Sequence, residues 1–246
     1  VIKTKNELYE YIKKTNGTLF VNQQDPILLK LLKNYSKTIL YNCFDLCKKN
    51  KIDTRNFYFE HNPFIKLYFK GFTIQTKIVG DYNTQNIAAS ITISEHFGVS
   101  LKRVSATLEE LELTNNRSQL INTKKNRILL DAYNANPTSV TLAIHSFKKL
   151  VNNEKYKENL IILGDMLELG KISLRSHQNI ICLLEKYNFK NCILIGDNFQ
   201  KTKTHYSKIR SIDECLLFLK KEQILNKTIL IKGSRNLKLE RIVKYL

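Results

Sequence analysis

The stretch Ile128-Leu-Leu-Asp-Ala-Tyr-Asn-Ala-Asn-Pro137 (ILLDAYNANP) joins a short apolar run to a polar segment that ends in proline. An apolar run bounded by turn residues predicts a buried strand of a parallel sheet. Pro137 suits the first turn of a following helix, and Asn136 directly before it suits the N-cap. The stretch therefore predicts a passage from a buried strand into a helix, with Asp131 and Tyr133 at the strand's carboxyl end.

The polar segment 131–137 has two interpretations. Asp131 can accept a hydrogen bond from a ribose hydroxyl or a metal-bound water, Tyr133 offers a ring that can stack on a base, and the asparagines can pair with an adenine edge or fix the loop. On spacing alone, an ordinary polar turn with Asn136 as the helix cap is the simpler interpretation.

The same alternation continues through the second half of the chain. We expect strands ending at Asp131 and over 160–163, 192–195 and 228–231, and helices after Pro137 and over 174–187, 212–221 and near 237–245. Four strands alternating with four helices predict a small doubly wound, Rossmann-like α/β domain, whose ligands gather at the carboxyl ends of the strands. Four polar loops follow those ends: 131–137, 164–170, 196–197 and 232–235.

The first half predicts a different domain. Helices over 3–14 and from Asp25-Pro26 alternate with short strands at 18–21 and 38–41, which indicates parallel sheet. Residues 57–79 predict two or three antiparallel strands on the edge of that sheet, and helices follow at 83–97 and 101–111. The polar run 113–118 is interpreted as a linker or hinge. The expected domains are therefore 1–115 and 116–246.

Composition limits the classes of protein that the chain can represent. The formal charge is +18, but the lysines are spread along the chain among many asparagines, without an arginine-rich arm, an aromatic RNA-binding strand motif or a zinc finger. We therefore expect no nucleic-acid partner, and a basic nucleic-acid-binding module is the alternative. No apolar run approaches the ~18 residues that a membrane span needs, and no signal region is present, so a cytoplasmic protein is expected. The five scattered cysteines predict reduced thiols.

Three motifs in this order, DAYNANP at 131–137, ILGDMLELG at 162–170 and ILIKGSR at 229–235, resemble the Mur ligases of peptidoglycan synthesis. The GDMLELG form is typical of the member that adds D-alanyl-D-alanine to a UDP-N-acetylmuramoyl-tripeptide, using ATP and Mg²⁺ and passing through an acyl phosphate. A Mur-type ligase that adds a single amino acid is the alternative within the family. The resemblance implies the remainder of a central ATP-binding domain followed by the C-terminal ligase domain.

The resemblance also implies roles for individual residues on the nucleotide side. The family's arginine between domains, which reaches ATP phosphate, matches Arg117. The positions implied for binding ATP are Asn83, Asn86, Arg117, Asp131, Tyr133 and Asn136. Without the family, Asn83 is a helix cap and Arg117 a solvated charge in a polar linker.

Further positions are implied for catalysis and for the incoming dipeptide. Lys5 matches the family's carbamylated lysine, which helps to hold Mg²⁺ beside the γ-phosphate; otherwise it is a surface lysine of an amphipathic helix. Acidic groups of the 164–170 loop, Asp165 and Glu168, would shape the acceptor side and receive the dipeptide ammonium. Lys232, Gly233 and Ser234 would bind a carboxylate, or simply form a tight turn. His177 is expected on a helix surface.

The glycine-rich GTNGKT-type phosphate loop of the family is not found in the sequence. The nearest match, Thr15-Asn16-Gly17, is followed by Thr18-Leu19 rather than lysine. We therefore expect residues 1–246 by themselves to be inactive, and the chain to be a monomer. A binding protein that works without catalysis is the alternative.

Overall fold

The computed structural model describes residues 2–46, 53, 55–61, 63–152 and 158–246. They divide into two compact units, Val1–Lys77 with Tyr82–Leu111, and Ile78–Asp81 with Glu112–Leu246. The boundary between the two units falls after Leu111, just before the polar run 113–118. Three non-glycine residues of the linker, Asn115, Asn116 and Ser118, have positive φ, a conformation that asparagine tolerates better than most residues.

The first unit contains a two-stranded parallel sheet and a separate four-stranded sheet. Its elements are α1 (Ile2–Lys14), β1 (Leu19–Asn22), α2 (Pro26–Leu32), β2 (Thr38–Tyr41), β3 (Cys43–Asp45), β4 (Phe57–His61), β5 (Phe64–Phe69), β6 (Phe72–Val79), α3 (Asn83–His96) and α4 (Leu101–Glu110). Strand β1 pairs with β2 in parallel, as the alternation of strands and helices predicts.

The prediction that residues 57–79 lie on the edge of the first sheet is wrong. Strands β4, β5 and β6 form, but they join β3 in a sheet of their own, in the order β3-β4-β5-β6. Strand β3 pairs in parallel with β4, through Cys43 opposite Phe57. Phe57 also stacks on Phe69, with ring centroids 3.9 Å apart, so aromatic side chains of this segment pack against one another within the second of these sheets.

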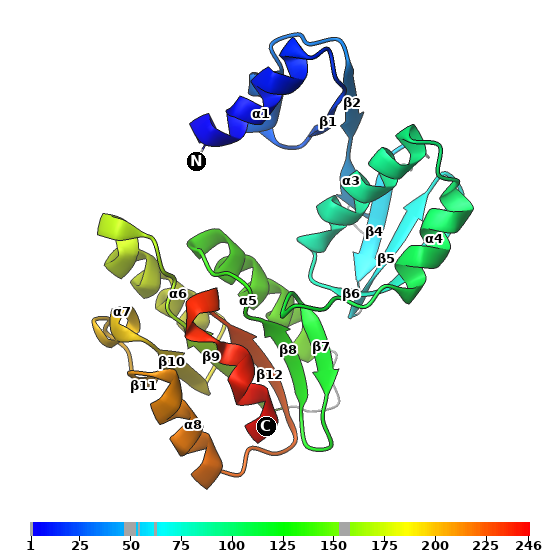
Figure 1. Ribbon diagram of the computed structural model, residues 1–246. Helices are drawn as coiled ribbons and strands as arrows, with labels where there is room; N and C mark the ends of the chain where they lie inside the picture. The colour runs from blue at the N-terminus through cyan, green and yellow to red at the C-terminus, as the bar shows by residue number, and fades with distance from the viewer. Residues whose placement is uncertain (1, 47–52, 54, 62, 153–157) are drawn as a thin grey trace. The chain divides into compact units, whose positions relative to one another are not determined.

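The second unit is a single six-stranded sheet in the order β11-β10-β9-β12-β8-β7, with helices on both faces (Figure 1). Its elements are β7 (Gln119–Asn122), β8 (Arg127–Asp131), α5 (Pro137–Asn152), β9 (Glu158–Gly164), η2 (Gly170–Ile172), α6 (Ser173–Lys186), β10 (Cys192–Ile195), α7 (Asp197–Gln200), β11 (Ser207–Ile209), α8 (Ile212–Lys221), β12 (Lys227–Lys232), η3 (Arg235–Leu237) and η4 (Leu239–Tyr245). All neighbours pair in parallel except β7, which is antiparallel to β8.

The four predicted strands form the middle of this sheet, and two further strands extend it. Their runs of apolar residues are buried on both faces, as parallel strands require. Ile128 and Leu130 belong to the cluster that packs against α8 and η4, whereas Leu129 between them points to the other face and is also buried. The last predicted helix forms 3₁₀ turns instead, after a left-handed Lys238.

The cysteines that the structure describes are free thiols. Cys43, Cys182, Cys192 and Cys215 are free, and burial raises the pKa of Cys43 and of Cys192 to about 12. Cys47 lies outside the described residues. In the part of the chain that the structure describes, every helix is too short or too polar to cross a bilayer.

Gly233 allows the end of β12 to pack against the end of β9. A Cβ atom at this position would lie 2.5 Å from Leu239 Cδ1 and 3.0 Å from Gly164 Cα. We expect Gly233→Ala to lower the free energy of unfolding by about 1–3 kcal/mol, because overpacking forces these neighbours apart. Asn236→Ala, at an exposed position of the same loop, is the control. Urea denaturation followed by circular dichroism measures both, and equal stabilities would contradict the packing described.

Candidate functional site

The site lies at the carboxyl edge of the six-stranded sheet in the second unit, where β12 ends between β8 and β9. Lys232, the last residue of β12, turns toward the loop that follows β8. Its Nζ donates to Asp131 Oδ2 at 2.8 Å, to the Asn134 carbonyl at 3.0 Å and to the Asp131 carbonyl at 3.4 Å. An ammonium has three N–H donors, so these acceptors use all of them. Lys232 is 2% exposed, and the carboxylate that it meets is that of Asp131 rather than that of a ligand.

Asp131 is engaged on both carboxylate oxygens. Oδ2 accepts from Lys232, and Oδ1 accepts from the Ser118 backbone N–H at 3.3 Å. Asp131 is 9% exposed. Its position therefore differs from the free acceptor that a ribose hydroxyl would need, and the carboxylate joins the linker, the 131–137 loop and β12.

Ser234 joins the end of β12 to the 164–170 loop on the other side. Its Oγ accepts from the Leu167 N–H at 2.9 Å, and its own N–H donates to the Asp165 carbonyl at 3.2 Å. The side chain is buried. Lys232 and Ser234 therefore hold one loop each, and the three residues Lys232-Gly-Ser234 bind the two polar loops into one edge.

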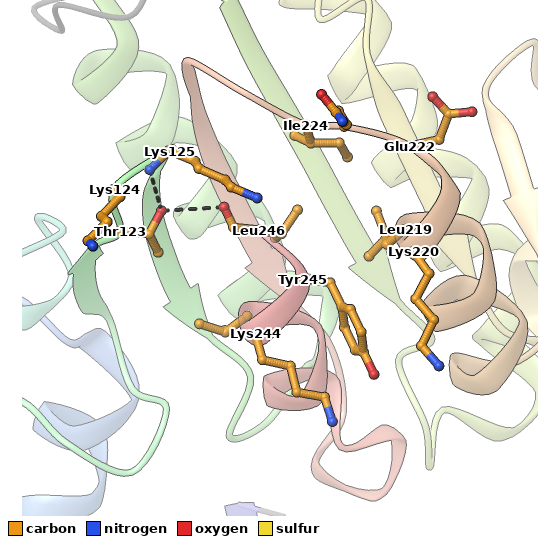
Figure 2. A pocket seen from close by; sticks show the side chains of 12 residues that line it. Thr123, Lys124, Lys125, Leu219, Lys220, Glu222, Ile224, Lys244, Tyr245 and Leu246 are labelled. Atoms are coloured by element: carbon orange, nitrogen blue, oxygen red, sulfur yellow. Dashed lines mark hydrogen bonds between the residues drawn. The ribbon is translucent and has the colours of Figure 1, made fainter.

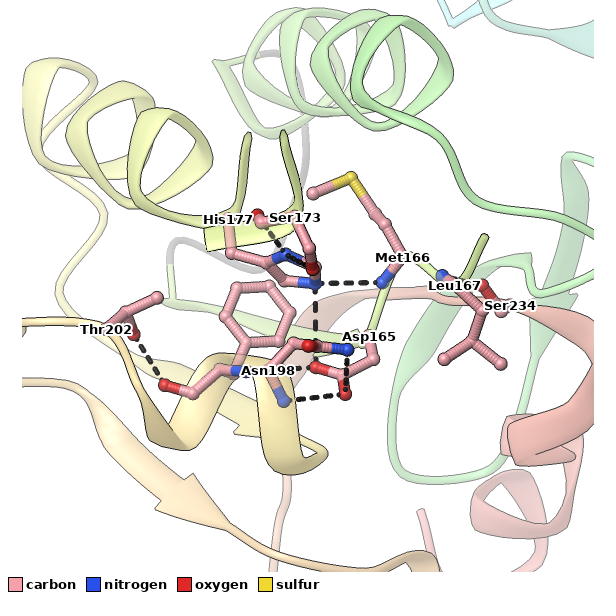
Figure 3. A network of polar contacts seen from close by, with 9 residues as sticks. Asp165, Met166, Leu167, Ser173, His177, Asn198, Thr202 and Ser234 are labelled. Atoms are coloured by element: carbon pink, nitrogen blue, oxygen red, sulfur yellow. Dashed lines mark hydrogen bonds and ion pairs between the residues drawn. The ribbon is translucent and has the colours of Figure 1, made fainter. Parts of the chain in front are cut away.

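Asp165 is buried at the centre of the network in Figure 3. Oδ1 accepts from the Phe199 N–H at 3.0 Å, and Oδ2 accepts from the Asn198 N–H at 2.9 Å and from Asn198 Nδ2 at 3.0 Å. Asp165 thereby satisfies the first free N–H groups of α7. Gly196 makes the approach possible, because a Cβ there would lie 2.3 Å from Asp165 Cγ. Asp165 was expected to receive a ligand ammonium; the structure gives it these internal donors.

His177 is fully buried, so the expectation of a helix-surface histidine is wrong. Its Nε2 accepts from the Met166 backbone N–H at 3.0 Å, and Nδ1 lies 2.8 Å from the Ser173 carbonyl. A backbone N–H can only donate and a carbonyl can only accept, so the ring is neutral with its proton on Nδ1. The 3.5 Å approach of Nε2 to Asp165 Oδ1 is therefore not an ion pair. His177 fixes the backbone of the 164–170 loop.

Asn136 caps α5, as the sequence predicts. Its Oδ1 accepts from the Ser139 N–H at 2.9 Å, and its own N–H donates to Ser139 Oγ at 3.1 Å. This reciprocal pair is a capping box, and Pro137 takes the first helical position. The cap orients the 131–137 loop relative to α5.

Tyr133 is the exposed residue of the 131–137 loop, with 40% of its surface accessible. The guanidinium carbon of Arg117 lies 3.7 Å from its ring centroid, and that of Arg235 lies 5.5 Å away. A base was expected on this ring, but Arg117 already lies over it. Arg235 was not predicted as a site residue. The available signal was its place directly after the KGS turn at the end of a strand.

The remaining predicted residues are distributed over both units. Glu168 is exposed, with φ of 65°. Asn83 is the first helical residue of α3 rather than its cap, and its Oδ1 accepts from Asn86 Nδ2 at 3.3 Å. Lys5 belongs to α1, but its side chain lies outside what the structure describes.

The described residues do not form a metal site of their own. Within the described ranges, no group of three or more His, Cys, Asp or Glu side chains is placed to hold a metal ion. These residues therefore offer no cluster of protein side chains that would hold Mg²⁺ on its own.

A cavity of about 610 Å³ lies at the opposite edge of the sheet, before the start of β8 and β12 (Figure 2). Lysine, leucine and tyrosine side chains line it, among them Lys125, Lys220 and Tyr245. None of the predicted site residues takes part. At the carboxyl edge, the side chains of Tyr133, Arg117, Arg235 and Glu168 are exposed.

Comparison with known proteins defines the class. Residues 116–235 match the family model of the Mur ligase, glutamate ligase domain. Residues 116–235 therefore belong to the Mur ligase family. Over its full length it is 30% identical to the UDP-N-acetylmuramoyl-tripeptide–D-alanyl-D-alanine ligase of Buchnera aphidicola subsp. Baizongia pistaciae, and covers 54% of that protein. It is 31% identical, over 69% of its own length, to the ligase of the same name from Bacillus subtilis, and covers 38% of that protein.

Solved structures show the same fold. The crystal structure II of MurF from Acinetobacter baumannii superimposes with a TM-score of 0.72 at 21% identity, covering 99% of this chain and 54% of that one. MurF ligase from Thermotoga maritima in complex with ADP gives a TM-score of 0.72 at 18% identity, covering 93% of this chain and 52% of that one. The chain thus spans about half the length of these proteins.

The buried Lys232–Asp131 pair predicts strong coupling between its two side chains. Lys232→Met leaves a buried carboxylate without its cation, and we expect a loss of about 3–5 kcal/mol in the free energy of unfolding. Combining it with Asp131→Asn should cost much less than the sum of the two single variants. Lys227→Met, at the exposed Lys227–Glu158 pair on the other end of β12, should change stability little. Additive losses in a urea-denaturation cycle would contradict the coupling.

Proposed function

We propose that the chain is the nucleotide- and dipeptide-binding part of a cytoplasmic, ATP-dependent amide ligase of peptidoglycan synthesis, which acts as a monomer. The substrates would be a UDP-N-acetylmuramoyl-tripeptide and D-alanyl-D-alanine. One observation carries the proposal: the loops 131–137, 164–170 and 232–235 form a single hydrogen-bonded edge, in a chain similar over its full length to relatives that bear this ligase's name.

The proposed reaction has two steps. The terminal carboxylate of the tripeptide attacks the γ-phosphorus of ATP, which gives an acyl phosphate and ADP. The amine of D-alanyl-D-alanine then attacks the acyl carbon, the C–O bond to phosphate breaks, and an amide, phosphate and a proton are released. Both steps bring anions together, so the protein contributes mainly positioning and neutralisation of charge.

The exposed residues of the edge suit these tasks. Arg117 would neutralise phosphate charge, with its guanidinium supported by the Tyr133 ring at 3.7 Å. Glu168 is exposed and would accept hydrogen bonds from the dipeptide ammonium, while buried Asp165 positions the loop. Asp131, Asn136, Lys232, Gly233 and Ser234 would act on ligands through the loops that they hold.

The first unit would serve the nucleotide through Asn83 and Asn86 at the start of α3, where the partial positive charge of a helix N-terminus favours anions. In this proposal Lys5, as a carbamate, has an indirect part in holding Mg²⁺, which would offset phosphate charge when bound with ATP. Residues 1–246 by themselves are expected to release no phosphate from ATP, since their sequence contains no glycine-rich lysine loop.

Phosphate release tests the proposal in the protein as it occurs in the cell. Release from ATP should require the tripeptide precursor and D-alanyl-D-alanine together, and L-alanyl-L-alanine should not substitute. Glu168→Gln should raise KM for the dipeptide about tenfold, because removing the carboxylate charge weakens its hydrogen bond to the dipeptide ammonium. Glu222→Gln, an exposed acid beside the opposite edge of the sheet, should leave KM unchanged.

Phosphate release at the same rate with and without the dipeptide would contradict the proposed function. Equal KM values for Glu168→Gln and Glu222→Gln would instead contradict the role given to Glu168. The ligase proposal itself is tested by whether phosphate release requires both substrates.

A further inference from the structure

We propose that Arg117 and Arg235 form a two-arginine seat for an anionic group, built on the ring of Tyr133. In this seat Arg235, rather than Lys232, is the contact that the 232–235 loop makes with a ligand. The identity of the ligand rests on the proposed function, because the nucleotide phosphates and the dipeptide carboxylate are both anions at this edge. The seat itself rests on the placement of the three side chains.

The ammonium of Lys232 has no N–H donor left for an anion. All three N–H donors of Lys232 meet protein oxygens, at 2.8, 3.0 and 3.4 Å. Gly233 is packed against Leu239 and Gly164. The Ser234 N–H is bound to the Asp165 carbonyl, and the side chain is 5% exposed. An anion that drew Lys232 away would leave Asp131 buried without its cation, which is costly.

Arg235 is the residue of this loop that faces outward. It is exposed and begins η3, directly after the inward-facing serine. Its guanidinium carbon lies 5.5 Å from the Tyr133 ring centroid. The backbone at this point is held by Ser234 and by the Leu237 N–H, which donates to the Ser234 carbonyl at 3.0 Å. The loop that anchors the two neighbouring loops therefore also fixes the origin of an exposed cation.

Two like charges share the Tyr133 ring. The guanidinium carbons of Arg117 and Arg235 both lie within 5.5 Å of one ring centroid. Within the described residues, neither guanidinium forms an ion pair with a carboxylate, and the nearby Asp131 is already neutralised by Lys232. The aromatic face attracts both cations, but their mutual repulsion is not offset by an acidic side chain. An anion bound between them would offset it.

Arginine on an aromatic platform suits this task. The planar guanidinium can stack on a ring and still present its N–H edge, in a fork that matches phosphate and carboxylate oxygens. Arg117 comes from the start of the second unit and Arg235 from near its end, so an anion held by both would join the linker to the last loop. Tyr133, on the loop between β8 and α5, would keep both guanidinium groups beside one ring.

Binding of simple anions to the full protein tests the seat. The probes are inorganic tripolyphosphate, which represents the nucleotide phosphates, and D-alanyl-D-alanine, which carries a carboxylate. The protein has eight arginines, so titrations followed by the Nε–H signals of ¹⁵N-labelled arginine can resolve single residues. We expect the Arg117 and Arg235 signals to shift together. Arg235→Gln should weaken binding about tenfold, and Arg235→Lys, which keeps the charge without the fork, should weaken it less.

The control is Lys221→Gln, which removes one positive charge at the C-terminal end of α8. It should leave the affinities for tripolyphosphate and for the dipeptide unchanged. If Arg235→Gln weakens only tripolyphosphate, the seat holds phosphate; if it weakens only the dipeptide, the seat holds the carboxylate. Affinities unchanged by Arg235→Gln, a shift of Arg117 without Arg235, or no binding of either probe to the wild type would each overturn the seat. Phosphate release with both substrates judges the proposed function separately.

Discussion

The carboxyl edge of the six-stranded sheet depends on one buried ion pair. Lys232 at the end of β12 uses its whole donor capacity on Asp131 and Asn134, residues that are about a hundred positions earlier in the chain. Because both partners are buried, neither charge can be solvated by water if the other is lost. The loops on either side inherit their positions from this pair and from Ser234. The pair also sets the chemistry of the surface, since a neutralised Asp131 leaves the exposed arginines as the dominant charge.

A division of labour follows between residues that hold loops and residues that face outward. Four polar residues are buried and form hydrogen bonds to backbone groups or to a partner side chain: Lys232, Ser234, Asp165 and His177. Preorganisation of this kind keeps the exposed groups in place without a reorganisation cost when a ligand arrives. Arg117, Tyr133, Glu168 and Arg235 are the exposed groups, and they originate from four separate segments. Their combined surface is what the proposed ligase would use.

Local sequence predicted the local parts of this edge. The apolar runs before 131, 164, 196 and 232 predicted the central strands, because parallel strands are buried on both faces. Asn136 before Pro137 predicted the cap, because both residues have fixed places at a helix start. The orientation of Lys232 could not be predicted in this way, since it depends on β12 entering the sheet between β8 and β9. For the same reason His177, on an amphipathic helix, gave no sign that the 164–170 loop would cover it. The arginine pair on Tyr133 likewise needs three segments brought together.

The most direct test is a crystal structure of the protein with ADP and D-alanyl-D-alanine bound. Lys232 Nζ should remain on Asp131, and ligand oxygens should lie within hydrogen-bonding distance of Arg117 or Arg235. A structure in which Lys232 leaves Asp131 and binds a ligand oxygen, with the arginines turned away, would contradict the separation between the holding residues and the exposed ones.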